Sequence, residues 1–302
     1  MNTPSLNLLN PRRMQTAIEG HLSDDFGRNE PLLGDCLVYL GVLTPEQIDK
    51  ALTEQRRNGG LFGEAVIRLK MASRDQVYTA LALQDGYLNP VISPVVLPKG
   101  LALLRRPNDI AAERIRLLRT KLLTMQTAEQ LSLFSIIPAA YNVRAEFIAC
   151  NLAAAFAQLG RKTLLVDADL RKPRVRRFLN LKPHKGLASA LAGKAALTEI
   201  VQETIIANLF AMTASPQKNN PQELLAADRL PTLFKEMAQN FDNVIVLSAP
   251  NGREGDGQFA WSATGAGLVV ARRNVTRFHE LKILQSTLRQ LDVSVFGAAM
   301  TR

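Results

Sequence analysis

The sequence predicts an α/β protein in which a parallel sheet flanked by helices follows a small all-α domain. A tandem repeat of helix-forming segments occupies residues 32–84, and from residue 131 short apolar runs alternate with longer amphipathic segments. Such alternation is typical of parallel strands buried on both faces by helices. We expect a flexible N-terminus, a helical repeat domain, a linker and an α/β domain, in that order, over residues 1–30, 31–88, 89–108 and 109–302.

The repeat has a period of 29 residues, and its two copies match at corresponding positions. Leu32-Leu33-Gly34-Asp35 matches Leu61-Phe62-Gly63-Glu64 in the second copy. Later in each copy, Thr44 and Ser73 are typical helix N-caps that are followed by acidic residues in the first turn. Each copy therefore predicts a helix, a turn and a second helix, and the two copies together bury apolar faces that neither could bury alone.

This repeat resembles the N-terminal domain of the type II secretion and pilus ATPases, the MshE N-terminal type. In members of that family that bind cyclic di-GMP, each motif begins with Arg-Leu-Gly. Here Leu32 and Leu61 stand at the arginine positions, while Gly34 and Gly63 keep the glycines. Leucine lacks the planar donor fork with which arginine binds guanine or phosphate. These four residues are thus the remnant of a cyclic di-GMP site, and they favour a plain interaction domain.

Six prolines and glycines between residues 85 and 108 predict an extended linker. A helix is expected next, over about residues 109–125. It carries Glu113, Arg116 and Arg119, a spacing that places the three side chains near one face of a helix. From the residues alone, this face is a solvated charged surface.

The α/β domain is expected to contain six strands and three long helices. Apolar runs predict the strands at residues 131–137, 162–166, 208–213, 244–247, 267–271 and 293–298. Amphipathic segments predict the helices at residues 145–159, 221–240 and 277–291. Right-handed crossovers between parallel strands follow from the general connection rule.

Composition excludes several classes of protein. The chain has 302 residues, 47% of them hydrophobic, so we expect a folded protein, and we expect neither a signal peptide nor a transmembrane helix. Cys36 and Cys150 lack neighbours at metal-ligand spacing and are expected to be buried thiols, so no metal site is predicted. The net charge of +10 favours an anionic membrane face or an acidic partner. No nucleic-acid-binding motif accompanies the scattered arginines, and no nucleic-acid partner is expected.

The stretch 151–173, which contains Asp167-Ala168-Asp169, resembles the bacterial exopolysaccharide tyrosine autokinases, especially their EpsG type. The segment 220–225, Asn-Pro-Gln-Glu-Leu-Leu, resembles a second motif of that family. The resemblance implies a P-loop NTPase-like fold, ATP and magnesium as cofactors, and a Walker A-prime role for Asp167 and Asp169. It also implies that Glu113, Arg116 and Arg119 bond to a neighbouring subunit in a ring.

The motifs that would carry phosphoryl transfer depart from the family pattern. The loop after the first strand contains no glycine, although a working P-loop wraps phosphates with backbone N–H groups and adds a Lys and a Ser or Thr. Leu247 stands at the Walker B acid, and the C-terminal tyrosine cluster is missing. The degenerate P-loop residues are Tyr141, Asn142, Val143, Arg144, Ala145 and Glu146. Asp167, Asp169 and Asp256 persist, as a remnant magnesium site or as caps of turns.

Three functions remain open from the sequence. The favoured one is a non-catalytic, kinase-like regulatory or scaffolding partner in exopolysaccharide synthesis and export, without a cofactor. The second is an active atypical tyrosine kinase or ATPase that uses ATP, magnesium and Arg144. The third is a regulator that responds to cyclic di-GMP. The expected partners are a membrane polysaccharide co-polymerase and an active paralogous kinase, in a homo- or hetero-oligomer at the cytoplasmic face of the inner membrane.

Overall fold

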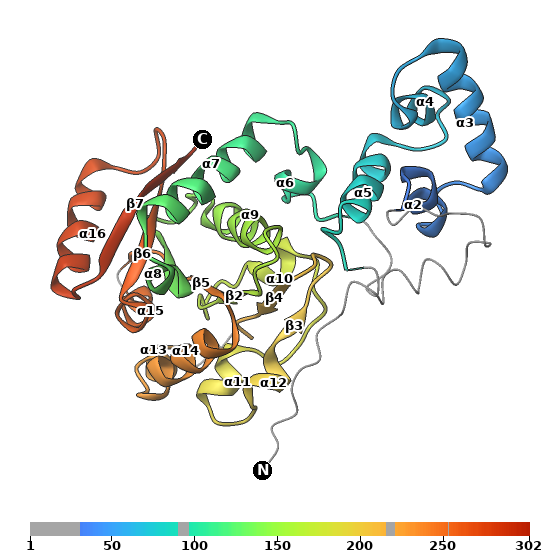
Figure 1. The fold of residues 1–302 in the computed structure, drawn as a ribbon. Coiled ribbons are helices and arrows are strands. Elements are labelled where there is room, and N and C mark those ends of the chain that lie inside the picture. The colour runs from blue at the N-terminus through green and yellow to red at the C-terminus, as the bar shows by residue number, and fades with distance from the viewer. Residues whose placement is uncertain (1–30, 90–96, 216–220, 253) are drawn as a thin grey trace. The chain divides into compact units, whose positions relative to one another are not determined.

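The computed structural model describes residues 31–89, 97–215, 221–252 and 254–302 (Figure 1). The chain divides into two compact units, Met1–Val96 and Leu97–Arg302, which we describe separately. The expected flexible N-terminus, residues 1–30, lies outside the described residues.

The first unit contains four helices in the order that the repeat predicts. They are α2 (Leu33–Tyr39), α3 (Pro45–Asn58), α4 (Phe62–Arg68) and α5 (Arg74–Gln84). Helix α2 packs on α5, and α4 packs on α3. Since α4 and α5 are the repeats of α2 and α3, each first helix contacts the second helix of the other copy, so both copies share one core.

Equivalent capping interactions begin the helices of both copies. The backbone N–H of Thr44 donates to Gln47 Oε1 and that of Ser73 to Gln76 Oε1, each at 2.8 Å. At the first helix of each copy, Leu32 N–H donates to the Asp35 carboxylate at 3.0 Å, as Leu61 N–H does to Glu64 at 3.1 Å. These bonds satisfy backbone donors that a helix start leaves free, and the predicted starts at Thr44 and Ser73 are confirmed.

The second unit is built on a seven-stranded sheet with the order β3-β4-β2-β5-β1-β6-β7. All neighbouring strands are parallel except β3 and β4. The predicted α/β class and its six parallel strands are confirmed, whereas the short antiparallel edge strand β3 was not predicted. The strands are β1 (Leu133–Pro138), β2 (Thr163–Asp167), β3 (Gln202–Glu203), β4 (Leu209–Met212), β5 (Asn243–Leu247), β6 (Ala266–Arg272) and β7 (Ser294–Thr301).

Helices surround this sheet (Figure 1). The predicted long helices at residues 109–125, 145–159 and 277–291 are present as α7 (Ile110–Met125), α9 (Ala145–Ala157) and α16 (Phe278–Gln290). The sequence did not indicate α15 (Asp256–Thr264), which packs against β1 and β6. The shorter helices are α8 (Ala128–Ser132), α10 (Val175–Phe178), α11 (Leu187–Leu191) and α12 (Leu197–Ile200).

The single helix predicted over residues 221–240 is wrong. Two helices occupy this stretch, α13 (Pro221–Leu225) and α14 (Arg229–Asn240). Pro231 lies in the first turn of α14. A proline in a helix interior removes a hydrogen bond and clashes with the carbonyl four residues earlier, so a helix that contains Pro231 has to begin just before it.

The expected linker is also too long, because its second half is folded. Residues 90–96 lie outside the described residues, but α6 (Ala102–Arg105) follows in the second unit. Leu101, Leu103 and Leu104 are buried there. The Asn151 side chain of α9 donates to Gly100 O at 2.9 Å and accepts from Leu103 N–H at 3.3 Å. This segment is therefore attached to α9 rather than extended.

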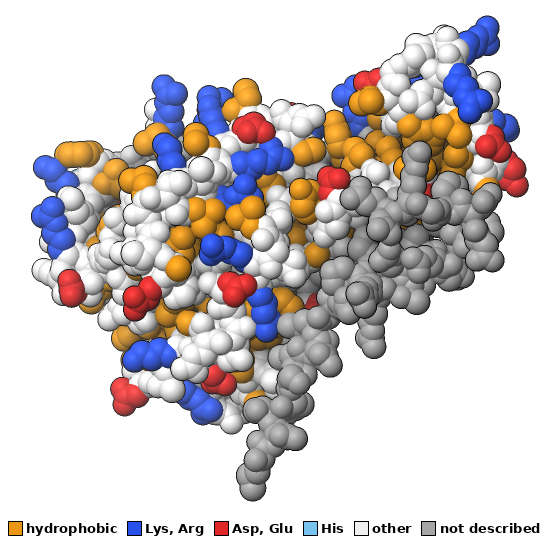
Figure 2. All heavy atoms as spheres, viewed as in Figure 1, with side chains coloured by type: hydrophobic (Ala, Val, Ile, Leu, Met, Phe, Trp, Pro, Cys, Tyr) orange, Lys and Arg blue, Asp and Glu red, His pale blue; other side chains and the backbone are white. Residues whose placement is uncertain are grey.

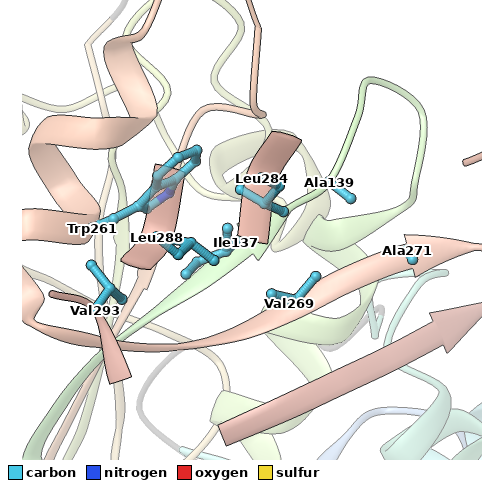
Figure 3. Close-up of a cluster of buried hydrophobic side chains, with 8 residues drawn as sticks. All are labelled: Ile137, Ala139, Trp261, Val269, Ala271, Leu284, Leu288 and Val293. Carbon is cyan, nitrogen blue, oxygen red and sulfur yellow. The ribbon is translucent and has the colours of Figure 1, made fainter. Parts of the chain in front are cut away.

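Apolar clusters hold the helices to the sheet. On the α15 and α16 side, Trp261 and Leu284 meet side chains of β1 and β6 (Figure 3). Near the other end of the sheet's first strand, Phe134 packs edge-on against Phe156 of α9 and also meets Phe296 of β7. Figure 2 shows Lys and Arg side chains spread over the visible face of this unit, with Asp and Glu among them. The core thus fixes the carboxyl ends of β1, β2 and β5, where the predicted site residues lie.

Candidate functional site

The carboxyl ends of three neighbouring strands bring most predicted site residues together. Strand β2 ends at Asp167, β5 ends at Leu247, and β1 leads through the loop 139–144 into α9, which begins at Ala145. Because β5 lies between β1 and β2, these three ends face one small volume. In open parallel sheets this edge is where ligands bind.

A pocket at this edge has a volume of only about 10 Å³. That space holds about one water molecule, whereas pockets for small-molecule ligands have roughly 300–1,000 Å³. As its side chains stand, this pocket is therefore too small for a magnesium–nucleotide complex. The pocket is lined by Pro138, Ala140, Ala145, Asp167, Asp169, Arg174, Leu247, Ser248 and Pro250.

The two acids of the Asp-Ala-Asp motif cap the turn that follows β2. The Asp167 carboxylate, fully buried, accepts backbone N–H groups of Arg174 at 2.7 Å and Val175 at 2.9 Å. The Asp169 carboxylate accepts those of Arg171 at 3.2 Å and Lys172 at 2.8 Å. Both carboxylates thus serve as acceptors for the turn.

Burial changes the protonation of Asp167. Loss of solvation raises the pKa of its carboxyl from 3.8 to about 7, while the backbone hydrogen bonds from Val175 and Arg174 act in the opposite direction. Desolvation prevails because backbone N–H groups replace only part of the hydration of a charged oxygen. Asp167 is therefore a carboxyl that titrates near neutral pH.

The other predicted acids are held by arginines. Asp256, at the start of α15, is buried, and its carboxylate accepts Arg171 Nη2–H at 3.2 Å and forms a second bond to Arg171 Nε. Glu146, in the first turn of α9, forms an ion pair with Arg174, whose Nη1 lies 3.1 Å from Glu146 Oε2. The sequence analysis did not assign Arg171 and Arg174, which follow the acidic motif, to these carboxylates. Their position after a strand end was the available signal.

The loop 139–144 is held in a conformation that non-glycine residues rarely adopt. Asn142 and Arg144 have φ angles of 63° and 57°. Asparagine tolerates this left-handed region, but arginine is strained there. The ends of β6 and β7 hold this loop, since Arg272 Nη1 donates to Asn142 O at 3.2 Å and the Thr301 hydroxyl donates to Val143 O at 2.8 Å.

The remaining residues of this loop differ in exposure. Val143 and Ala145 are buried, whereas Tyr141 and Arg144 are exposed. The Lys172 ammonium lies 5.0 Å from the centre of the Tyr141 ring, within the range of a cation–π contact. The exposed guanidinium of Arg144 is not among the groups that line the pocket. Among the residues that the structure describes, no cluster of three or more His, Cys, Asp or Glu could hold a metal ion.

The charged triplet of α7 bonds partly to its own chain. Arg116 Nη1 donates to Pro107 O at 2.7 Å and also pairs with Glu113. Arg119 Nη1 donates to Ala155 O of α9 at 2.9 Å. Glu113 is exposed. The two arginines therefore help to fix α7, and Glu113 presents a carboxylate to solvent.

In the first unit, the glycines and leucines of the repeat have separate roles. Leu32 and Leu61 are exposed just before α2 and α4. A Cβ atom on Gly34 would lie 3.3 Å from Ile48 Cδ1, and one on Gly63 would lie 2.9 Å from Val77 Cγ1. Both glycines therefore allow close helix packing at equivalent places in the two copies.

The chain is similar in sequence to several bacterial tyrosine-protein kinases. No family model matches the chain. The chain is 31% identical over 254 residues to the tyrosine-protein kinase ptk of Acinetobacter johnsonii, covering 79% of this chain and 35% of the relative. It is 30% identical over 194 residues to the tyrosine-protein kinase etk of Escherichia coli K12, covering 64% of this chain and 27% of the relative. The chain thus spans about a third or less of the length of these relatives.

Solved structures agree with the sequence relatives. The kinase domain of Escherichia coli tyrosine kinase ETK superimposes with a TM-score of 0.64 at 28% identity, covering 72% of this chain and 85% of that domain. The chimerical protein CapA2B2 gives a TM-score of 0.61 at 25% identity, covering 73% of this chain and 96% of that protein. The similarity in sequence extends over most of this chain, and the similarity in fold covers the same α/β architecture. The chain is a homologue of the bacterial tyrosine-protein kinases.

Proposed function

We propose that this chain is a non-catalytic relative of the bacterial tyrosine-protein kinases that acts as a regulatory or scaffolding subunit in exopolysaccharide synthesis and export. One observation carries the proposal: the pocket at the carboxyl ends of β1, β2 and β5 has a volume of only about 10 Å³. We infer that the Arg174–Glu146 ion pair and the Leu247 side chain replace the open space, the lysine and the acid that a P-loop protein needs.

Electrostatics support the same reading. A nucleotide brings several negative charges, and the residues at the pocket include Asp167 and Asp169, with Glu146 beside them. Arg171 and Arg174, which could offset such charge, are already paired with Asp256 and Glu146. A phosphate chain would therefore compete with Asp256 and Glu146 for these two guanidinium groups.

Isothermal titration calorimetry with ATP and magnesium tests the proposal, with the ETK kinase domain as the positive control. We expect no saturable heat up to about 1 mM ATP for this chain, because its pocket lacks the volume of a nucleotide site. Saturable binding that Asp167→Asn removes would contradict the proposal. That result would favour the alternative, an active atypical kinase or ATPase that uses the persisting acids.

The third function, a response to cyclic di-GMP, depends on the first unit. Here the exposed Leu32 and Leu61 offer no hydrogen-bond donor, and Gly34 and Gly63 have a packing role. We therefore favour a protein-interaction role for the repeat. Titration of the full chain with cyclic di-GMP should give no binding in the micromolar range, and tight binding would reinstate this function.

The proposed partners are a membrane polysaccharide co-polymerase and an active paralogous tyrosine kinase, met at the cytoplasmic face of the inner membrane. The CapA2B2 chimera, which has a similar fold, supports a partner of the first kind. Within the part of the chain that the structure describes, no helix has the length and hydropathy needed to cross a membrane. Co-purification with each candidate, with and without high salt, tests whether the surplus of basic residues contributes.

A further inference from the structure

The loop after β6 and the first turns of α16 form a surface on which basic and apolar side chains alternate. Val275, Phe278 and Ile283 are exposed by 45%, 72% and 57%. Single exposed apolar side chains are ordinary, but three large ones within nine residues form a patch. Exposed basic residues lie among them, and we call the whole set the α16 tip: Arg273, Val275, Arg277, Phe278, Lys282 and Ile283.

Hydrogen bonds hold the α16 tip in one conformation. The backbone N–H groups of Val275 and Thr276 both donate to Arg272 O, at 3.2 and 2.9 Å, and Arg272 N–H donates to Thr276 Oγ1 at 2.8 Å. The Glu280 carboxylate accepts Arg277 N–H at 2.8 Å, which fixes the start of α16. The exposed side chains therefore project from a folded turn, and little ordering is needed when they bind.

The charge of this surface is almost entirely positive. Between residues 257 and 291 the sequence has one acidic residue, Glu280, and its carboxylate caps α16. None of the ion pairs among the described residues involves the α16 tip. The adjoining loop 139–144, to which Arg272 Nη1 is bonded, adds the exposed Arg144. The tip is therefore complementary to an anionic partner.

The apolar side chains gather at one end of α16. Its later exposed residues are polar or charged: Gln285, Ser286, Arg289 and Gln290. On its inner side, Leu284 and Leu288 pack with Ile137 and Trp261 (Figure 3). A partner helix lying along α16 would need an apolar stripe over its whole length. The observed distribution instead favours contact with the end of the helix.

The mixture of side chains favours lipid over protein as the partner. In the dry centre of a protein interface, lysine is depleted and an unpaired charge is costly. At a bilayer surface, apolar side chains enter the acyl boundary while Lys and Arg keep their charged groups at the phosphates. The Lys282 ammonium lies 4.9 Å from the centre of the Phe278 ring, so the two kinds of group are neighbours here. A bilayer accepts both at different depths.

We propose that the α16 tip binds an anionic lipid surface directly. Phe278, Val275 and Ile283 enter the boundary between headgroups and acyl chains, and Arg273, Arg277 and Lys282 contact the lipid phosphates. The inference goes beyond the proposed function, in which this chain meets protein partners at the membrane. It does not depend on whether the pocket at the ends of β1, β2 and β5 binds a nucleotide.

Flotation of the full chain with lipid vesicles tests the proposal. We expect binding to phosphatidylcholine vesicles that contain about a third phosphatidylglycerol, and little binding to phosphatidylcholine alone. Binding should decrease as salt is raised, because salt screens the attraction between exposed charges. Absence of binding to the anionic vesicles, or equal binding to both kinds, would overturn the proposal.

Two variants test the two parts of the contact. The double variant Arg277→Gln with Lys282→Gln should weaken binding about twentyfold, at about fivefold for each charge. Its control is Arg56→Gln with Arg57→Gln, which removes the same charge from exposed positions of α3. Phe278→Ser should weaken binding about fivefold or more. Its control is Leu159→Ser, because Leu159 is exposed just before β2, at the opposite edge of the parallel sheet.

Circular dichroism checks that each variant is folded, and both control variants should bind vesicles as the wild type does. Normal vesicle binding by the two α16 variants would place the lipid contact elsewhere and overturn the proposal. A protein partner at the tip would give a different result: the α16 variants would lose co-purification with the kinase or co-polymerase, while the wild type would not float with vesicles. Calorimetry with ATP is a separate measurement, so failure of the proposed function would not be mistaken for failure of this one.

Discussion

Arg174 Nη1 lies 3.1 Å from Glu146 Oε2, which joins the turn after β2 to the first turn of α9 across the position of the degenerate P-loop. Both side chains are partly buried, with exposures of 30% and 24%. The pair neutralises a carboxylate at the start of a helix and holds the arginine over the pocket. This contact therefore links the turn after β2 to the start of α9.

Removal of this pair should lower stability. Glu146→Gln and Arg174→Gln should each reduce the free energy of unfolding by about 1 kcal/mol, and the double-mutant cycle should show a coupling energy of about 0.5–1 kcal/mol. Urea unfolding followed by the fluorescence of Trp261, the single tryptophan, measures this, because Trp261 lies in the same unit. Additive effects of the two substitutions would show that the side chains do not interact in solution.

Asp167 should make stability depend on pH. Its pKa is raised by burial from 3.8 to about 7, so between these values the folded protein retains a proton that the unfolded chain has lost. Stability therefore decreases as pH rises from about 4 to about 7, and this contribution is flat above that range. Asp167→Asn should remove the decrease. Urea midpoints of both proteins at several pH values test it, and parallel curves for the two proteins would contradict it.

The glycines of the repeat offer a matched pair of substitutions. Gly63→Ala should destabilise the first unit by about 1–2 kcal/mol, because the new Cβ would lie 2.9 Å from Val77 Cγ1. Gly34→Ala meets Ile48 Cδ1 at 3.3 Å, so relaxation of the Ile48 side chain and the better helix propensity of alanine should leave it near neutral. Thermal unfolding followed by circular dichroism at 222 nm compares the two. Equal effects would show that the close approach at Gly63 does not matter.

Substitutions in the charged triplet of α7 can distinguish contacts within the chain from contacts with a neighbouring subunit. Glu113 is exposed and its pair with Arg116 is a surface pair, so Glu113→Ala should change the free energy of unfolding by less than about 0.5 kcal/mol. It should weaken assembly with the cognate kinase about fivefold if the carboxylate reaches a neighbouring subunit. Arg119→Ala loses the bond to Ala155 O and should cost about 1 kcal/mol in stability. Light scattering of mixtures and urea unfolding measure the two effects. Normal assembly of Glu113→Ala would leave the triplet with its intrachain role alone.

The sequence by itself determined the local architecture. The 29-residue repeat located four helices, and the alternation of apolar runs located six of the seven strands of the sheet. These features follow from side-chain periodicity and capping residues, which act over a few positions. The break before Pro231 was also readable from the sequence, and the error there came from giving the amphipathic pattern more weight than the proline. Leu247 and the glycine-free loop were likewise visible as departures from a working site.

Only the tertiary structure decided which charges meet. Arg171 and Asp256 are 85 positions apart in sequence, and Arg174 and Glu146 are 28 apart. Their pairing depends on the strand order, in which β5 lies between β1 and β2. The spacing of apolar residues along the sequence predicts the strands but not their order in the sheet. The burial that raises the pKa of Asp167 and the contact between Arg272 and the loop 139–144 depend on this order as well. Contacts between distant segments depend on how complete elements pack, so they are settled only when the whole unit folds.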